Sequence, residues 1–475
     1  MLIVPDILLV LLALAIVAVD LVVHGRRDHR PCYRTAWIGL LVVLVVQCLL
    51  PRDGSAVYFN GYRITPWSML FRQLFVACAL LTVWLSEPYF REGGNRRGRL
   101  TRAGDFYAIL VFSVIGMFTV VSACDLTMLF LGLEMATIPL YVLTAFQRND
   151  ETSGEAAIKY IVMGSLTTAI ILFGYSLLYG AAGSLRFDAI RAYAAAHPAD
   201  PLLLGGALFV LAAVCFKLAA APFHMWAPDV YEGAPTPVTA YISVASKTAA
   251  LGFMLLFFYG PLDPLRGTLA PVFVALAALS MAVGNLGALK QNNFRRFMAY
   301  SSVAQVGYIL TAFLSDRAFV TGALVYYIAV YLAGNMGAFF VFSIVGQRRE
   351  ESLDSLHGLS RRQPVLAAVL LLCMFSLAGV PPLAGFTGKF LLFACAAQSG
   401  HYRLLLFAAF NSVASLYYYM LVIKDAYIAE PTEEAAAIEV PPVARVALAL
   451  VTAALLTLGL WPGLNTLVFR IGAGL

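Results

Sequence analysis

The sequence predicts an all-α membrane protein with about 14 transmembrane helices. Of its 475 residues, 61% are hydrophobic and only 12% are charged, whereas a soluble domain has about a quarter of its residues charged. Apolar runs of about 20 residues recur along the chain, each long enough to cross a hydrocarbon core. Backbone polar groups in lipid must be satisfied within a segment, and these runs do not alternate, so we predict helices rather than a barrel.

The charged and cysteine residues exclude several other classes of protein. The net charge is +6, but the arginines form short clusters between apolar runs, which is the distribution of topology signals. We therefore expect a lipid bilayer and no nucleic acid as partner. The seven cysteines are scattered without a CxxC pair, which argues against a disulfide framework, a zinc site or an iron–sulfur cluster.

The predicted spans follow one another with short connections and leave no room for a sizeable soluble domain. Residues 181–198 are expected to form an exposed loop or a short interfacial helix. The spans are 2–24, 33–51, 66–89, 105–123, 126–146, 155–180, 202–224, 238–260, 267–289, 297–314, 319–346, 364–396, 402–427 and 441–468.

The basic residues predict the orientation of the bundle. Cytoplasmic connections of membrane proteins carry an excess of Lys and Arg, and here the odd-numbered connections are the more basic. Both termini are therefore expected on the periplasmic side. The more basic side carries Arg26, Arg27, Arg30, Arg91, Arg96, Arg97, Arg99, Arg102, Arg148, Lys290, Arg295, Arg296, Arg348, Arg349, Arg361, Arg362 and Lys424, and the other Arg52, Arg63, Arg186, Arg191, Arg266, Arg317, Arg403 and Arg470.

An internal repeat is predicted from three phrases that recur in the same order. The repeat maps span five onto span ten, an odd number of spans, so the two copies must have opposite orientations, as in secondary transporters. We expect segments at 1–103, 104–260 (spans 4–8), 261–428 (spans 9–13) and 429–475. The matching phrases are Tyr141–Phe146 with Tyr308–Phe313, Ser243–Ser246 with Ser412–Ser415, and Leu218–Pro222 with Leu377–Pro381.

Prolines interrupt the two matching spans seven and twelve. Pro222 lies in the first and Pro381 and Pro382 in the second. Because proline removes a helix hydrogen bond and clashes with the preceding turn, both helices are expected to break there. Freed backbone carbonyls are tolerated only inside the bundle or beside a wet cavity.

Four ionisable residues lie well inside predicted spans, where charges are costly and usually mark a transport route. They are Glu134, Lys217, Lys247 and Lys389. For each of them the alternative is a polar contact between helices. Desolvation disfavours a buried ammonium and a nearby carboxylate stabilises it, so a lysine under both influences can gain and lose a proton. We expect Glu134 to modulate Lys217 if their helices pack together.

Three further charged residues are less distinctive. Lys159 lies near the start of span six and could simply reach the surface, while His224 follows the break and could be a helix-end hydrogen bonder. Arg72 is expected to serve packing or lipid contact. No GxGxxG motif follows a strand, and no HExxH or GxSxG motif is present, so no cofactor or metal is expected in this chain.

The segment Phe216–Val238, followed by Lys247, resembles the antiporter-like subunits of respiratory complex I. Arg296–Ser302 and Leu377–Phe386 resemble the same family. The resemblance covers essentially the whole chain. It implies 14 helices with inverted five-helix repeats, and it implies proton transfer along Glu134, Lys217, Lys247 and Lys389, with a further lysine often found at the place of Lys159.

The resemblance also implies the setting. NADH oxidation and quinone reduction would occur in other subunits of a bacterial inner-membrane complex, with subunits K and M among the neighbours. The glutamate typical of M-type subunits is replaced here by Lys389, and the long lateral helix of L-type subunits is not seen. Two alternatives stay open: a Mrp-type cation/proton antiporter subunit, and a structural subunit without its own proton path.

Overall fold

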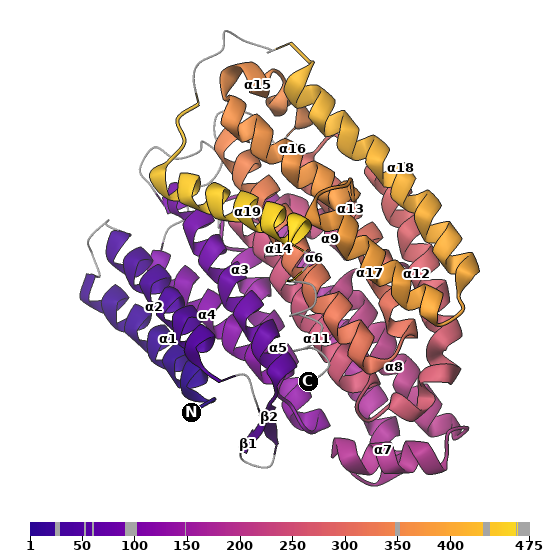
Figure 1. Cartoon of the computed structure of the whole chain (residues 1–475). Helices are drawn as coiled ribbons and strands as arrows, with labels where there is room; N and C mark the ends of the chain where they lie inside the picture. Colours follow the sequence, from indigo (N-terminus) through magenta and orange to yellow (C-terminus); the bar gives the residue numbers. More distant parts are fainter. Residues whose placement is uncertain are drawn as a thin grey trace.

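The computed structural model describes residues 1–23, 29–51, 54–58, 61–90, 102–147, 149–346, 352–430, 438–461 and 463. These residues form one bundle of long, tilted helices (Figure 1). The arginines used above at 26, 27, 52, 91, 96, 97, 99, 148, 348, 349 and 470 lie outside the described residues.

Thirteen helical segments of the described chain are long and apolar enough to cross a membrane, and a shorter apolar helix, α16, adds a fourteenth crossing together with α17. This confirms the predicted number of spans. The crossing helices are α1 (Val4–Val23), α2 (Arg30–Leu49), α3 (Pro66–Phe90), α4 (Ala103–Val120), α5 (Leu126–Thr144), α6 (Glu151–Ala182), α8 (Pro201–Leu218), α10 (Thr236–Tyr241) continuing into α11 (Lys247–Phe258), α12 (Arg266–Ala288), α13 (Phe294–Leu310), α14 (Arg317–Gly346), α16 (Pro364–Ala378) with α17 (Ala384–Gln398), α18 (Tyr402–Tyr427) and α19 (Pro442–Leu460).

Shorter elements connect these helices. The region 181–198 contains the amphipathic helix α7, so it is a short helix rather than a plain loop. A two-stranded antiparallel hairpin, which the sequence did not predict, precedes α3. The short elements are β1 (Ala56–Tyr58), β2 (Tyr62–Ile64), α7 (Phe187–Ala196), α9 (Trp226–Gly233), α15 (Leu359–Arg362), a π-helix (Ile242–Ser246) and 3-10 turns at Asp263–Leu265, Thr311–Leu314 and Leu353–Leu356.

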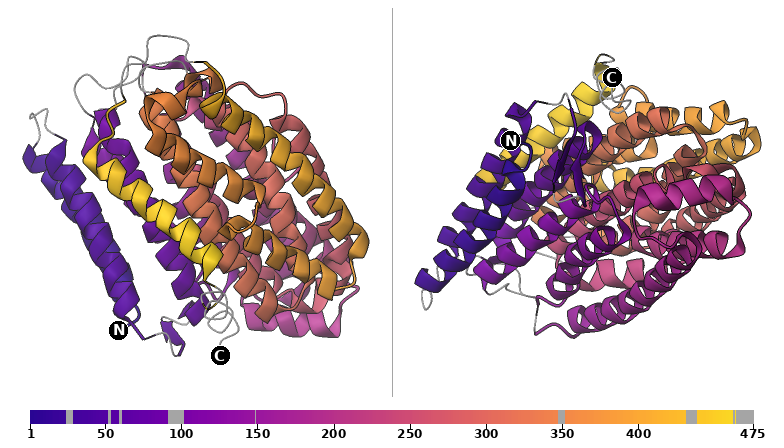
Figure 2. Two further views of the ribbon diagram at one scale, coloured as in Figure 1. Left: turned by 45° about the horizontal axis from the view of Figure 1, so that its top comes forward. Right: turned by 90° about the horizontal axis from the view of Figure 1, so that it is seen from below.

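The helices α1 and α2 lie side by side at one edge of the bundle (Figure 2). Arg72 of α3 helps to attach them, because it is only 1% exposed and forms an ion pair with Asp6 of α1 at 3.1 Å. Its guanidinium also donates to the hydroxyls of Tyr62 (2.6 Å) and Ser122 (2.7 Å). Arg72 therefore serves packing within the protein and makes no lipid contact.

Both predicted helix breaks are present, and they share one cap geometry. At the end of α8, Ala219 has a left-handed φ of 57°, and at the end of α16, Gly379 has a φ of 86°. The amide of Ala219 donates to the carbonyl of Phe216 at 2.9 Å, and that of Gly379 to Ser376 at 3.0 Å. The two breaks therefore match with Ala219 on Gly379, one residue away from the pairing that the sequence phrases predicted.

Glycines let two pairs of helices approach closely. A Cβ on Gly116 of α4 would lie 2.2 Å from the backbone nitrogen of Ala136 in α5. In the second half of the chain, a Cβ on Gly284 of α12 would lie 2.3 Å from the backbone nitrogen of Ala304 in α13. Small residues at such crossings replace the hydrophobic effect as the source of close packing between helices in lipid.

We expect Gly116→Ala to destabilise the bundle by about 1–3 kcal/mol, since the added methyl would force the backbones of α4 and α5 apart. The amount of folded chain in membranes and its thermal midpoint should both fall. Gly180→Ala is the matched control, because a Cβ there meets no atom within 4 Å. Equal behaviour of the two variants would contradict the close packing.

Candidate functional site

Lys217 lies at the end of the first half of the broken helix, in the last turn of α8. Its side chain is 4% exposed. The ammonium donates to the hydroxyls of Thr137 at 3.2 Å and Tyr141 at 3.3 Å, both on α5. Because the carbonyl end of a helix carries a partial negative charge, this position favours a cation.

Glu134 faces the same ammonium from α5. Its Oε1 lies 4.0 Å from Nζ of Lys217, and the carboxylate side chain is 15% exposed. The same oxygen accepts a hydrogen bond from Thr168 of α6 at 3.0 Å. The expectation that these two helices bring Glu134 to Lys217 is therefore confirmed as a contact.

Aromatic residues close the break above Lys217. The indole Nε1 of Trp226, the first residue of α9, donates to the carbonyl of Phe216 at 2.9 Å. The Trp226 ring stacks on Tyr160, with 4.7 Å between centroids. The Phe216 carbonyl, which also accepts from the Ala219 amide, thus has two donors inside the protein, as burial in the membrane favours.

Lys247 follows directly on the π-helix Ile242–Ser246, which widens the middle of this span. Its side chain is 3% exposed, and the ammonium donates to the hydroxyl of Ser302 in α13 at 2.6 Å. The ring of Tyr231 lies 5.9 Å from the ammonium. Single-turn π-helices within α-helices frequently occur at functional sites, and this one was not predicted from the sequence.

Lys389 lies on α17, just past the second break. The residue is 4% exposed, and its ammonium donates to the carbonyl of Ala378, the last residue of α16, at 2.8 Å. The hydroxyls of Ser412 and Ser415 on α18 lie at 3.2 and 3.5 Å. The ring of Tyr308 lies 4.6 Å from the ammonium. Lys389 thus belongs to the half-helix after the break, unlike Lys217, but its ammonium also lies at the carbonyl end of the half-helix before it.

A buried group of polar side chains, which we call the Gln305 cluster, lies between Lys247 and Lys389. The Gln305 amide donates to the carbonyl of Leu377 and to the hydroxyl of Tyr419, both at 3.0 Å. Tyr419 contacts the Ser301 hydroxyl at 2.5 Å, and Tyr327 donates to the amide oxygen of Gln305.

The Gln305 cluster borders both lysine sites. Ser301 is followed by Ser302, whose hydroxyl binds Lys247. Leu377 is followed by Ala378, whose carbonyl binds Lys389. This cluster was not predicted, because neutral polar residues in apolar runs are typical of ordinary contacts between helices. The only signal was the occurrence of Gln305 within a predicted span.

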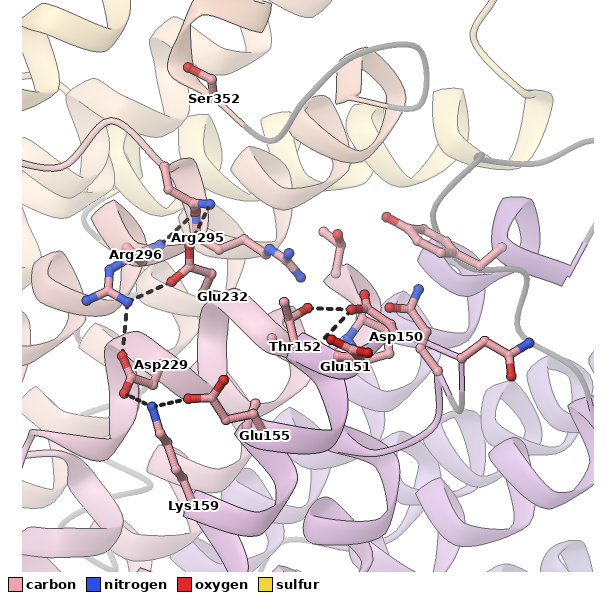
Figure 3. Close-up of a pocket in the computed structure, with 18 of the residues that line it drawn as sticks. Asp150, Glu151, Thr152, Glu155, Lys159, Asp229, Glu232, Arg295, Arg296 and Ser352 are labelled. Atoms are coloured by element: carbon pink, nitrogen blue, oxygen red, sulfur yellow. Dashed lines mark hydrogen bonds and ion pairs between the residues drawn. The ribbon is translucent and has the colours of Figure 1, made fainter.

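Lys159 lies at the wall of a cavity of about 1030 Å³, away from the buried lysines (Figure 3). Its side chain is 44% exposed. The cavity is polar and opens between α6, α9 and α13. Residues that line it include Asn149, Asp150, Glu151, Thr152, Glu155, Lys159, Asp229, Glu232, Arg295, Arg296 and Ser352.

A continuous chain of ion pairs crosses this cavity (Figure 3). The Lys159 ammonium lies 2.8 Å from Glu155 and 2.7 Å from Asp229. Arg296 lies 2.9 Å from the other oxygen of Asp229 and 2.6 Å from Glu232. The chain joins α6 and α9 to α13, and thus the first half of the protein to the second. Asp229, Glu232 and Arg296 were not among the predicted site residues, although all three lie in the segments Phe216–Val238 and Arg296–Ser302 that carry the family resemblance.

His224 lies in the turn between α8 and α9 and is 8% exposed. Its ring centroid is 6.4 Å from that of Tyr300, and its Nδ1 has no hydrogen-bond partner within the described part of the chain. The structure does not bring it to any of the three buried lysines. Among the described residues, no group of three or more His, Cys, Asp or Glu side chains is placed to hold a metal ion.

Comparisons of the sequence with curated proteins give consistent results. The family model "NADH:quinone oxidoreductase/Mrp antiporter, TM" matches residues 123–415. NADH-quinone oxidoreductase subunit N of Moorella thermoacetica is 40% identical over 458 residues, which is 96% of this chain and 94% of that protein. The subunit N of Rhodospirillum rubrum is 39% identical over 440 residues, 90% of this chain and 88% of that protein.

Solved structures share the fold. A chain of respiratory complex I from Thermus thermophilus with bound aureothin superposes with a TM-score of 0.83 at 34% identity, covering 97% of this chain and 98% of that chain. A chain of the Mrp complex from Dietzia sp. has a TM-score of 0.82 at 21% identity, covering 99% and 96%, and supports the fold alone. The chain therefore belongs to the NADH:quinone oxidoreductase/Mrp antiporter family of membrane subunits.

Proposed function

We propose that this chain is the N subunit of a proton-translocating NADH–quinone oxidoreductase and carries protons along Glu134, Lys217, Lys247 and Lys389. The observation that carries the proposal is the contact of Glu134 with the buried Lys217 at the broken end of α8. The near full-length likeness to curated subunit N proteins names the enzyme. NADH oxidation and quinone reduction belong to other subunits, and this chain contributes no redox group.

The pair supplies a way to capture and release one proton. With the Glu134 carboxylate near, the ammonium of Lys217 is stabilised by the opposite charge and by the helix end. If the carboxylate withdraws, the ammonium keeps only the two neutral hydroxyls of Thr137 and Tyr141 in a site that excludes water. Desolvation then favours release of the proton to the next acceptor.

The second half offers the next acceptors. Lys247 and Lys389 have neutral hydroxyl and carbonyl partners, and within the described residues neither forms an ion pair. The Gln305 cluster supplies hydroxyl and amide groups between them. We place the entry of the route on the side of the charged cavity at Lys159, Asp229 and Arg296, which is polar and open. Lys159 is there a surface cation held by the carboxylates of Glu155 and Asp229.

The two halves of the route correspond to the two copies of the proposed inverted repeat, residues 104–260 and 261–428. Residues 1–103 precede the repeat and residues 429–475 follow it. Matching backbone contacts support it. Phe187 donates to the carbonyl of Cys124 at 3.3 Å, and in the second half Leu353 donates to the carbonyl of Asn292 at 2.8 Å. The close helix crossings at Gly116 and Gly284 match in the same way.

The distribution of basic residues supports an inner-membrane orientation with both termini in the periplasm. The cavity at Lys159 would then face the cytoplasm and α7 the periplasm. Other membrane-arm subunits of the complex are the partners, and the resemblance to the family favours subunits K and M as direct neighbours.

Replacing Lys217 should abolish the proton path of this chain. At matched assembly, proton transfer through it is expected to fall about a hundredfold or more in Lys217→Ala, as when a positioned acid–base group is removed. The measurement is NADH-driven acidification of inverted membrane vesicles. In the variant, only the proton pumping carried by other subunits should remain. Lys424→Ala is the control, since Lys424 is an exposed lysine in the last turn of α18.

Two results would redirect the assignment. Normal pumping by Lys217→Ala in an intact complex would favour a structural subunit. Purification of the wild-type chain without NADH dehydrogenase subunits, with cation/proton exchange activity, would favour a Mrp-type antiporter.

Single cysteines should report the orientation. In a background with the exposed Cys48 replaced, Lys159→Cys is expected to react with a membrane-impermeant maleimide only in inverted vesicles. Arg191→Cys, on α7 at the other end of the bundle, should react only in right-side-out vesicles or intact spheroplasts. The reverse pattern would invert the proposed topology, while Lys217→Cys should stay unlabelled from either side because it is buried.

A further inference from the structure

A second pocket, of about 200 Å³, lies at the end of the bundle that carries α7 and the β-hairpin. Four arginines line it, and they come from three segments that are distant in sequence: Arg63 of β2, Arg186 and Arg191 at the start of and within α7, and Arg317 at the start of α14. We call this the arginine pocket. It is separate from the lysine route and is not used by the proposed function.

The arginine pocket has more positive charge than its acidic neighbours neutralise. Arg191 pairs with Asp263 at 3.1 Å, and Arg186 approaches Asp188 at 3.8 Å. Arg63 and Arg317 form no ion pair with any residue in the described ranges. Arg317 is within electrostatic reach of both Arg191 and Asp263, and Asp263 is already paired with Arg191 and lies 3.9 Å from Arg266.

Backbone hydrogen bonds of the fold hold two of these arginines in place. The amide of Arg63 donates to the carbonyl of Ser122 at 2.6 Å. Arg186 forms an isolated β-bridge with Asp125, the N-cap of α5. The cluster is therefore held by the same contacts that tie the hairpin and α7 to the bundle.

The surroundings of the arginine pocket place it at a membrane boundary. Trp67 at the start of α3 and Phe187 at the start of α7 line it, and Val57 of the hairpin is 52% exposed beside it. Tryptophan is enriched at the level of lipid headgroups. The arginines lie on the proposed periplasmic side, where membrane proteins carry few basic residues. The positive-inside rule therefore does not explain why four arginines occur together here.

We propose that the arginine pocket binds a phosphate group at the membrane surface, through Arg63 and Arg317. Guanidinium groups bind phosphate oxygens in a planar, bidentate geometry. Within the described residues, Arg63 and Arg317 have no carboxylate partner and can bind a phosphate in this way. The phosphate can come from the headgroup of an anionic phospholipid or from inorganic phosphate in solution.

The test measures binding to the purified, intact complex in neutral detergent. One arm titrates fluorescent phosphatidylglycerol, and the other titrates radiolabelled inorganic phosphate. An arginine near an anionic surface contributes about 1 kcal/mol, so Arg63→Gln with Arg317→Gln should weaken the saturable site about 30-fold. Arg63→Lys with Arg317→Lys should retain most of the binding. Arg403→Gln is the control, because Arg403 lies outside the pocket at the start of α18.

The two arms separate the sources. Weakening in the phosphatidylglycerol arm alone identifies a lipid headgroup, and weakening in the phosphate arm alone identifies the free ion. Equal binding by wild type and the glutamine pair in both arms, or no saturable binding by wild type, would overturn the proposal. If the glutamine pair lowers assembly, Arg63→Gln alone is used, with about fivefold weakening expected.

Discussion

The burial of an ammonium at the carbonyl end of a broken helix is the constraint on which the rest of the structure depends. Lys217 and Lys389 both use this arrangement, each 4% exposed. Lysine in the middle of a bilayer is costly, and a helix end offers it partial negative charge and free carbonyls. The breaks in turn require a protein interior around them. Close helix crossings at Gly116 and Gly284 help to supply that interior.

The two breaks share a cap but differ in what they do with the freed carbonyls. At the first, Trp226 takes the carbonyl of Phe216, and Lys217 turns to Glu134. At the second, Lys389 itself takes the carbonyl of Ala378. A lysine held by a carboxylate responds to movement of that carboxylate, whereas a lysine held by backbone responds to movement of its helix. The first break therefore holds its lysine beside a carboxylate, and the second holds its lysine by a backbone carbonyl.

Much of this could be predicted from sequence, because membrane burial acts on composition over long stretches. The spans, the breaks at Pro222 and Pro381 and the four buried charges each follow from local sequence. The π-helix before Lys247, the Gln305 cluster and the ion pairs of Arg296 could not be predicted, since each depends on contacts between segments far apart in the chain. The one-residue error in matching the breaks arose because Ala219 adopts a left-handed conformation, which alanine rarely does and which the sequence therefore does not predict.

The central claim is that Glu134 and Lys217 act as one unit, and a double-mutant cycle tests it most directly. NADH-driven proton pumping would be measured for Glu134→Gln, Lys217→Met and the double variant, at equal assembly. If the carboxylate works through the ammonium 4.0 Å away, the double variant should pump no less than Lys217→Met alone, because the second change removes nothing further. Losses that simply multiply would show that the two residues act independently and would contradict the account.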